Sequence, residues 1–181
     1  MVGTLTVQNL QGPTSGANAN KVIIPSGQTI DASAGTLVPS AGAVVQVIQT
    51  YNPNASHINT NSGSLVASGI TASITPKYSN SLIIVEYSCS MGISTASHMR
   101  AQMYMSVGSG ARAAMSGSAN YHITYMEDDS RYIPIVFKGN YTATSINTLT
   151  FEPYFTSSND GIVYFTHQYS SYSLTLTEIK Q

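Results

Sequence analysis

The sequence predicts an all-β protein: an antiparallel β-sandwich of the jelly-roll type, preceded by an extended, turn-rich segment. Apolar residues alternate with polar ones at a period of two through most of the chain after Gly42, which is the pattern of half-buried strands. Clusters of Ser, Asn and Gly separate these segments at short intervals, as in sandwiches and jelly rolls. No window of about 11 residues carries a clean apolar stripe at helical spacing.

The first 42 residues differ in pattern from the rest of the chain. Short apolar stretches such as Val22–Ile24 and Leu37–Val38 lie between turn residues such as Pro25-Ser26-Gly27. One thread of this kind cannot bury its own apolar side chains, whereas several intertwined copies could. We interpret residues 1–42 as an oligomerisation and anchor segment and residues 43–181 as the sandwich domain. The alternative is a flexible arm that packs on its own domain.

The first strands are predicted from β-branched residues and from apolar positions that share one side. Ala43–Thr50 is rich in β-branched residues, and Leu65–Thr75 has Ile and Ala at alternate positions near its end. Leu82–Met91 places five apolar side chains on one side, opposite Glu86 and two serines. In Arg100–Val107, Ala, Met and Val alternate with polar residues and Tyr. Each segment therefore predicts a strand with one face toward a core.

The second half of the chain continues the alternation. The remaining predicted strands are Tyr121–Met126, Ile133–Phe137, Thr148–Phe155, Ile162–Tyr169 and Ser171–Lys180. Pro134 and Pro153 each remove one backbone donor from their strands, so we expect each of these two strands at a sheet edge or at a bulge. The last strand runs nearly to the end of the sequence, so the C-terminus is expected to be part of a sheet.

The chain carries very little charge. Asp, Glu, Lys and Arg make up 8% of it, where an ordinary soluble domain has about 25%. Its polarity comes from 26 Ser, 19 Thr and 12 Asn, and its 12 Tyr are partly polar. Such a surface lets copies of one chain pack together without charge repulsion. The formal net charge of −1 offers no basic field for a phosphate backbone, so nucleic acid is not an expected ligand. No stretch approaches 18 apolar residues, so membrane insertion is not expected either.

Motifs that carry chemistry are missing from the sequence, and we expect no enzyme, metal or cofactor. Cys89 is the only cysteine and lies in an apolar strand pattern, where it is interpreted as a small core residue. The four histidines have no zinc-ligand spacing, although a trimer axis could still bring three copies of one histidine together. The acidic run Glu127-Asp128-Asp129 lacks the rest of a calcium loop and is interpreted as a solvated turn.

Tyrosine-rich segments near the end of the chain are the candidate ligand site. Tyrosine has an apolar ring face and a polar tip, which suit it to stacking on sugars and to protein interfaces. The alternative is that these tyrosines fill the core and the seams between subunits. The candidate ligand-binding residues are Asn159, Tyr164, His167, Tyr169 and Tyr172.

Several segments resemble phage virion proteins. The ending Ser173–Lys180, with its Leu-Thr-Leu-Thr-Glu-Ile core, is similar to the terminus of small phage fibre proteins, as are the segments Ile70–Pro76 and Ser81–Val85. The segments Val7–Leu10 and Ile24–Asp31 resemble virion proteins of phages that infect marine bacteria, of the cyanophage and pelagiphage type. The resemblance covers most of the chain. It implies a homotrimeric tail-fibre or head-fibre protein with a jelly-roll tip.

Together these observations predict a virion structural protein: a trimeric tail fibre or spike that adheres to a host-surface glycan or outer-membrane component. Its expected partners are itself and, through the N-terminal segment, other virion proteins. The start of the chain has no basic region followed by an apolar one, so we expect synthesis in the host cytoplasm and release by lysis. The alternatives are a capsid decoration or head-fibre protein and a free carbohydrate-binding module.

Overall fold

The computed structural model describes residues 12–19, 21–29, 38–94, 96–115, 121–126, 132–157, 161–166 and 170–181, the range 121–126 by its backbone alone. The chain separates into two compact units, Met1–Val38 and Pro39–Gln181. The described part of the first unit contains turns and no strand: Ala19 donates to the Gly16 carbonyl and Gln28 to the Pro25 carbonyl, both at 3.1 Å. Its Val22, Ile23 and Ile24 are 49%, 56% and 42% exposed.

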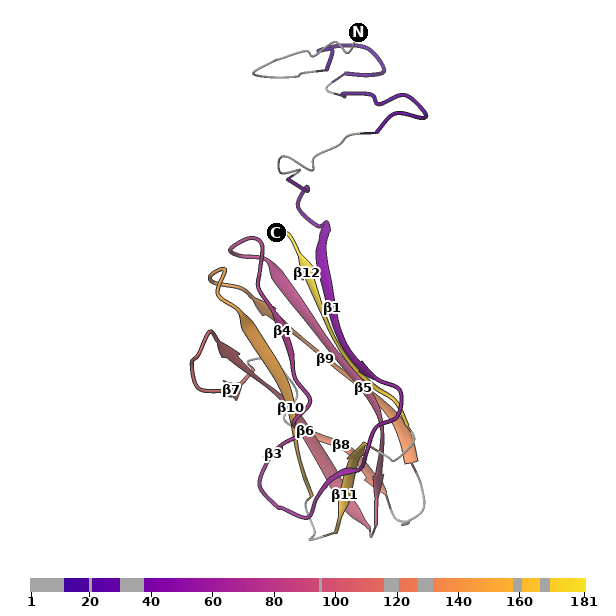
Figure 1. The fold of residues 1–181 in the computed structure, drawn as a ribbon, viewed down its shortest axis with the longest axis vertical. Coiled ribbons are helices and arrows are strands. Elements are labelled where there is room, and N and C mark those ends of the chain that lie inside the picture. The colour runs from indigo at the N-terminus through magenta and orange to yellow at the C-terminus, as the bar shows by residue number, and fades with distance from the viewer. Residues whose placement is uncertain are drawn as a thin grey trace. The chain divides into compact units, whose positions relative to one another are not determined.

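The second unit consists of two antiparallel sheets that face each other (Figure 1). No helix occurs in the described residues. The strands of the first sheet are β1 (Val44–Asn52), β2 (Ile58–Thr60), β5 (Leu82–Ile93), β9 (Tyr132–Thr142), β11 (Val163–Thr166) and β12 (Tyr172–Ile179). The strands of the second sheet are β3 (Val66–Ala67), β4 (Ala72–Ile74), β6 (Ser97–Val107), β7 (Ala113–Ala114), β8 (Tyr121–Met126) and β10 (Leu149–Ser157).

The strand pairs are nested, as in a long hairpin wrapped around a core. β1 pairs with β12, β4 with β10, β5 with β9, and β6 with β8, so the outermost pair joins the two ends of the unit. Successive pairs of this nest lie in alternate sheets, which makes the chain cross repeatedly between the layers. This is the connectivity of a jelly roll, and the predicted antiparallel sandwich is confirmed.

The core lies between the sheets, where the alternation in the sequence places it. On β5 the residues from Ile83 to Met91 at alternate positions are at most 6% exposed, whereas Glu86 and Ser88 lie on the outer face. A row of stacked rings joins the layers: Tyr87 on β5 stacks on Phe165 of β11 at 5.0 Å, and Phe165 stacks on Phe155 of β10 at 4.5 Å. Stacked aromatic side chains bury large apolar areas and fix the spacing of the two sheets.

A buried carboxylate fastens one end of the sandwich. Glu178 on β12 continues the inward-facing positions of its strand and is 0% exposed. Gln46 Nε2 donates to it at 2.6 Å, Ser81 Oγ at 2.7 Å, and the backbone N–H of Lys77 at 2.9 Å. The N–H of Tyr78 donates at 3.2 Å as well. These donors satisfy the carboxylate in place of water and hold the turn between β4 and β5 against β1.

The two prolines take different positions in the sheets. Pro134 lies on β9, which pairs only with β5 among the described strands, so it is at an edge as its missing N–H predicted. The expectation for Pro153 was wrong, because β10 is a central strand between β6 and the short strands β3 and β4. Its carbonyl accepts from Ser68 N–H at 3.1 Å, so its nitrogen faces the break between β3 and β4, where no ladder donor is required.

Short or interrupted strands account for the other differences from the predicted elements. β2 and β7 have three and two residues and show no clear alternation, so the sequence pattern did not reveal them. The predicted strand Leu65–Thr75 is broken into β3 and β4 at Gly69, whose φ is 76°, a conformation that glycine adopts without strain.

Replacing Glu178 with Gln is expected to lower the free energy of unfolding by about 3 kcal/mol, because one acceptor oxygen becomes an NH₂ group that faces backbone donors. Equilibrium denaturant unfolding at a fixed protein concentration measures the loss. The matched control is Glu86→Gln on the outer face, whose 40% exposed side chain pairs with Lys138. That change is expected to cost less than about 1 kcal/mol. Equal losses in the two variants would contradict the structural role of Glu178.

Cys89 is expected to be unreactive in the folded protein. The thiol is buried and donates to the Phe165 carbonyl at 3.0 Å, and burial raises its pKa to about 12. Because the thiolate is the nucleophile, the protonated thiol should not react with Ellman's reagent at pH 8. One equivalent should react after unfolding in guanidinium. Rapid native-state labelling would show that the strand opens at this position.

Candidate functional site

Of the three tyrosines that the sequence grouped as a ligand patch, the structure describes Tyr164 and Tyr172 and places them on opposite faces of the first sheet. Tyr164 on β11 lies on the outer face of the first sheet, opposite Gly92 in the ladder, whereas its neighbours Val163 and Phe165 are fully buried. Tyr172 on β12 lies on the inner face, half-buried, with its ring 6.4 Å from the core residue Tyr87. Asn159, His167 and Tyr169 lie outside the described residues.

Tyr164 belongs instead to a cluster of three rings over Gly92. Gly92 of β5 is opposite Tyr132 of β9 on one side and opposite Tyr164 of β11 on the other. Strands two places apart are separated by about 10 Å. The ring centroids of Tyr132 and Tyr164 are only 6.4 Å apart, so the two rings lean toward each other above the glycine, which has no side chain to hold them apart. His57 contacts the Tyr164 ring at 5.0 Å in an edge-to-face geometry.

This aromatic platform, formed by His57, Tyr132 and Tyr164, is accessible from solvent. Tyr132 is 40% exposed, His57 is exposed and Tyr164 is half-buried. Partial burial and the neighbouring Tyr164 phenol raise the pKa of Tyr132, so its hydroxyl stays protonated at neutral pH. Ring faces with hydroxyl and imidazole groups at their edges can pack on the C–H face of a sugar and bond to its hydroxyls.

The sequence contains one indication of this platform, a glycine in a long strand, which the period-two alternation does not explain. Gly92 occupies an outward position at the end of the long strand β5, where a glycine often marks a close approach of other groups. Which rings cover that glycine depends on the pairing of β5 with β9 and β11. At their contacts with Gly92 these strands lie 40 and 72 positions further along the chain.

A second aromatic pair lies on the outer face of the other sheet. Tyr104 of β6 and Tyr154 of β10 stack at 4.0 Å between ring centroids. Beside them Glu152, although it faces outward, is only 2% exposed, because Arg112 pairs with it and the Gly69 N–H donates to it at 2.7 Å. Arg112 precedes β7, so this ion pair ties the β6–β7 connection across the sheet. We assign this cluster a structural role.

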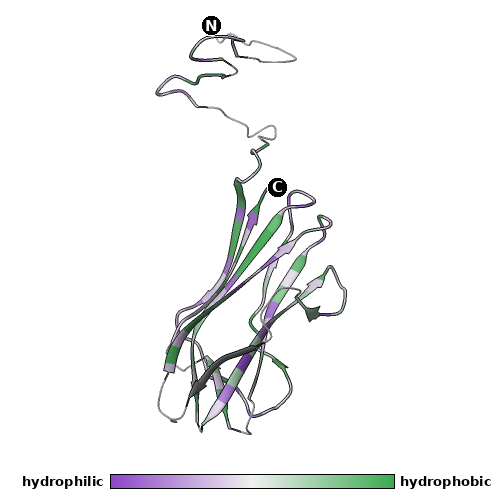
Figure 2. Ribbon diagram, turned by 180° about the vertical axis from the view of Figure 1, so that it is seen from behind, coloured by the Kyte–Doolittle hydropathy of each residue, from purple (hydrophilic) through white to green (hydrophobic). Residues whose placement is uncertain are grey.

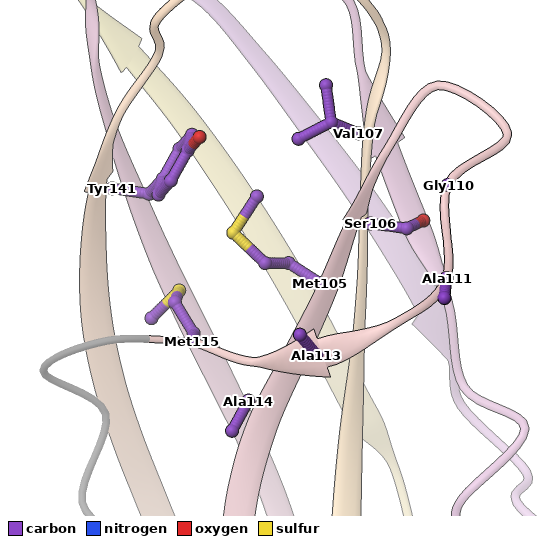
Figure 3. Close-up of a pocket in the computed structure, with 9 residues that line it drawn as sticks. All are labelled: Met105, Ser106, Val107, Gly110, Ala111, Ala113, Ala114, Met115 and Tyr141. Atoms are coloured by element: carbon purple, nitrogen blue, oxygen red, sulfur yellow. The ribbon is translucent and has the colours of Figure 1, made fainter.

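A pocket of about 340 Å³ lies between β6, the β6–β7 connection and β9 (Figure 3). Figure 3 shows Met105, Met115 and Tyr141 on one side of it, Ala111 on the connection and Ala113 on β7. Its described lining contains no charged residue and no side-chain amide. Apart from the hydroxyls of Ser106 and Tyr141, its described lining is apolar, so this pocket is suited to an apolar group.

The described residues contain neither a metal-ligand cluster nor a membrane-spanning helix. No three His, Cys, Asp or Glu side chains come together there. No helix in this part of the chain is long and apolar enough to cross a membrane. The acidic run Glu127-Asp128-Asp129, interpreted from the sequence as a turn, lies outside the described residues.

Comparisons with known proteins found similarity in structure and none in sequence. No protein-family model matches the chain, and no curated protein is similar to it in sequence. Among solved structures it is similar to the VP2 subviral particle of infectious bursal disease virus, with a TM-score of 0.45, 12% identity, and coverage of 93% of this chain and 46% of that one. The infectious bursal disease virus Gt strain structure gives a TM-score of 0.43 and 14% identity over 87% of this chain and 43% of that one. The chain therefore spans less than half the length of these proteins.

Proposed function

We propose that this chain is a virion structural protein that assembles as a homotrimeric fibre or spike and adheres to a glycan on the host surface. In this proposal residues 1–42 align the copies with one another and anchor them to the particle. The jelly roll forms the tip. The number of copies follows the resemblance to phage fibre proteins. No chemical reaction follows binding.

The observation that carries the proposal is the distribution of exposed apolar side chains. Most of the large apolar residues that are exposed in the described part of the chain lie between Val22 and Tyr51. Over the same stretch charge almost disappears, since Asp31 is the only Asp, Glu, Lys or Arg between Lys21 and Lys77. Exposed apolar side chains in a stretch with almost no charge favour association with other copies, which they can meet with little like-charge repulsion.

The aromatic platform supports the adhesive part of the proposal. It presents His57, Tyr132 and Tyr164 on the outer face of a rigid sheet, with ring separations of 5.0 and 6.4 Å. A single platform offers one ring cluster to a ligand and would bind weakly. Three copies on one fibre would raise the overall avidity by orders of magnitude if they reach neighbouring glycans.

Two other functions remain as alternatives to the tail fibre. A capsid decoration or head-fibre protein would share the trimeric sandwich and differ in its place on the particle, which labelled antibodies and electron microscopy of virions would locate. A free carbohydrate-binding module would share the aromatic platform and would be a monomer. The oligomeric state therefore separates the module from both virion proteins.

Full-length protein at micromolar concentration is expected to have three times the chain mass of 19.2 kDa, because the exposed apolar stretch becomes buried between copies. Size-exclusion chromatography with light scattering measures this mass directly. A value near 19.2 kDa at all concentrations would contradict the fibre proposal and favour the monomeric binding module.

Replacing Tyr164 or Tyr132 with Leu is expected to weaken glycan binding by about tenfold, because the flat ring face is lost while apolar volume is kept. Binding is measured on an array of bacterial envelope polysaccharides and then by titration of the strongest one. The matched control is Tyr154→Leu, a half-buried outward tyrosine on the other sheet. Binding that falls equally in the control, or in none of the variants, would exclude the platform as the glycan site.

A further inference from the structure

We infer that an apolar corner on the outer face of the first sheet is a contact between copies of this chain. The corner consists of Val44 and Val47 of β1, Leu82 and Ile84 of β5, and Ile179 of β12. This inference rests on the proposed self-assembly and goes beyond it, because it places a contact within the sandwich itself and not only in residues 1–42.

The register of three neighbouring strands brings the corner together. Val44 is opposite Ile179, and Ile179 is opposite Leu82. In the next outward row Val47 is opposite Thr177, and Thr177 is opposite Ile84. Directly opposed residues on one face have Cβ atoms about 5 Å apart, so these two rows form one continuous surface.

The corner is exposed, although its composition is that of a core. Val44 and Val47 are 59% and 55% exposed, and Leu82, Ile84 and Ile179 are half-buried. Figure 2 shows the hydrophobic colouring at the start of β1, where the chain enters the sandwich. Beyond the two apolar rows the same face becomes polar: Gln49 donates to Thr175 at 3.1 Å, and Lys138 pairs with Glu86. An apolar centre with a polar rim is the anatomy of a protein–protein interface.

The edge strand β1, which contributes Val44 and Val47 to the corner, has few of the usual protections against pairing. On its open side β1 pairs with no described strand, and it contains no Pro, Lys or Glu, its only irregularity being a bulge between Val44 and Gln46. The edge strand β9 on the opposite side of the sheet carries both Pro134 and Lys138. Exposed sheet edges are normally protected by such residues or by bulges, so β1, which has the bulge alone, is expected to be covered in the assembled protein.

Two observations identify the occupant as another copy. The corner adjoins the residues through which the first unit joins the sandwich, and Val38, six residues before Val44, is 61% exposed. Any association of residues 1–42 therefore brings the start of β1 of one copy close to that of the others. In addition, none of the five corner residues is charged and residues 38–76 contain no Asp, Glu, Lys or Arg, so the corner of one copy can meet that of another with little like-charge repulsion.

The test compares two outward-facing valines on one face of the first sheet. Val47→Lys places a charge in the corner, where desolvation and repulsion between copies should raise the concentration at which the oligomer dissociates by at least about tenfold. The matched control is Val136→Lys on β9, where the wild-type valine is 57% exposed, close to the 55% of Val47. Light scattering of full-length protein over a dilution series measures dissociation, and circular dichroism confirms the β-fold of each variant.

Each outcome decides between the contact and its alternatives. Dissociation of Val47→Lys with an intact Val136→Lys oligomer supports the corner as the contact, and Val44→Lys repeats the test if the first variant does not fold. An oligomer unchanged in both corner variants overturns this inference while the proposed trimer stands. Equal dissociation in the control also overturns it, because the effect is then not confined to the corner. A wild-type monomer removes both the inference and the proposed assembly.

Discussion

The pairing of the first strand of the sandwich with its last is the constraint on which the rest of the structure depends. β1 and β12 are opposed from Val44 and Ile179 to Asn52 and Tyr172. Beyond the strands, Gly42 N–H donates to the Lys180 carbonyl at 2.7 Å, and Lys180 N–H donates to the Ala43 carbonyl at 3.0 Å. Because all other pairs are nested inside this one, the loss of this ladder would release one edge of the first sheet and the turn that it holds.

The buried carboxylate on β12 extends this closure to the second sheet. Glu178 accepts hydrogen bonds from β1 and from the turn between β4 and β5. Gln46 also donates to the Thr75 carbonyl at 2.8 Å. Thr50 donates to the Thr71 carbonyl at 2.8 Å further along the same side. The edges of the two sheets are therefore joined by side-chain hydrogen bonds that replace the missing ladder between them.

The two faces of the first sheet serve different purposes. Its inner face packs the stacked rings of Tyr87 and Phe165 against Phe155 of the other layer. Its outer face carries the apolar corner at the start of β1 and the aromatic platform around Gly92, two features at opposite ends of β5. A tip that contacts other copies at one end of this strand and a ligand at the other would keep the ligand site clear of the assembly.

The sequence by itself determined the fold class and the inward positions of the long strands. The period-two alternation of β5, β6 and β12 is strong because one face of each strand is buried, and the low charge is visible in composition alone. It also placed Cys89 in the core. These properties are local, since each depends on neighbours within one strand.

The tertiary structure decided what depends on pairing between distant segments. The sequence could not show that Tyr164 faces Tyr132 and His57, because these rings come from distant parts of the chain and meet only through the pairing of β5 with β9 and β11. The sequence predicted an edge or a bulge at Pro153, because the break between β3 and β4 that accommodates its missing donor comes from another part of the chain. The apolar corner likewise combines residues from both ends of the sandwich and its middle, and only the register of β1, β12 and β5 brings them side by side.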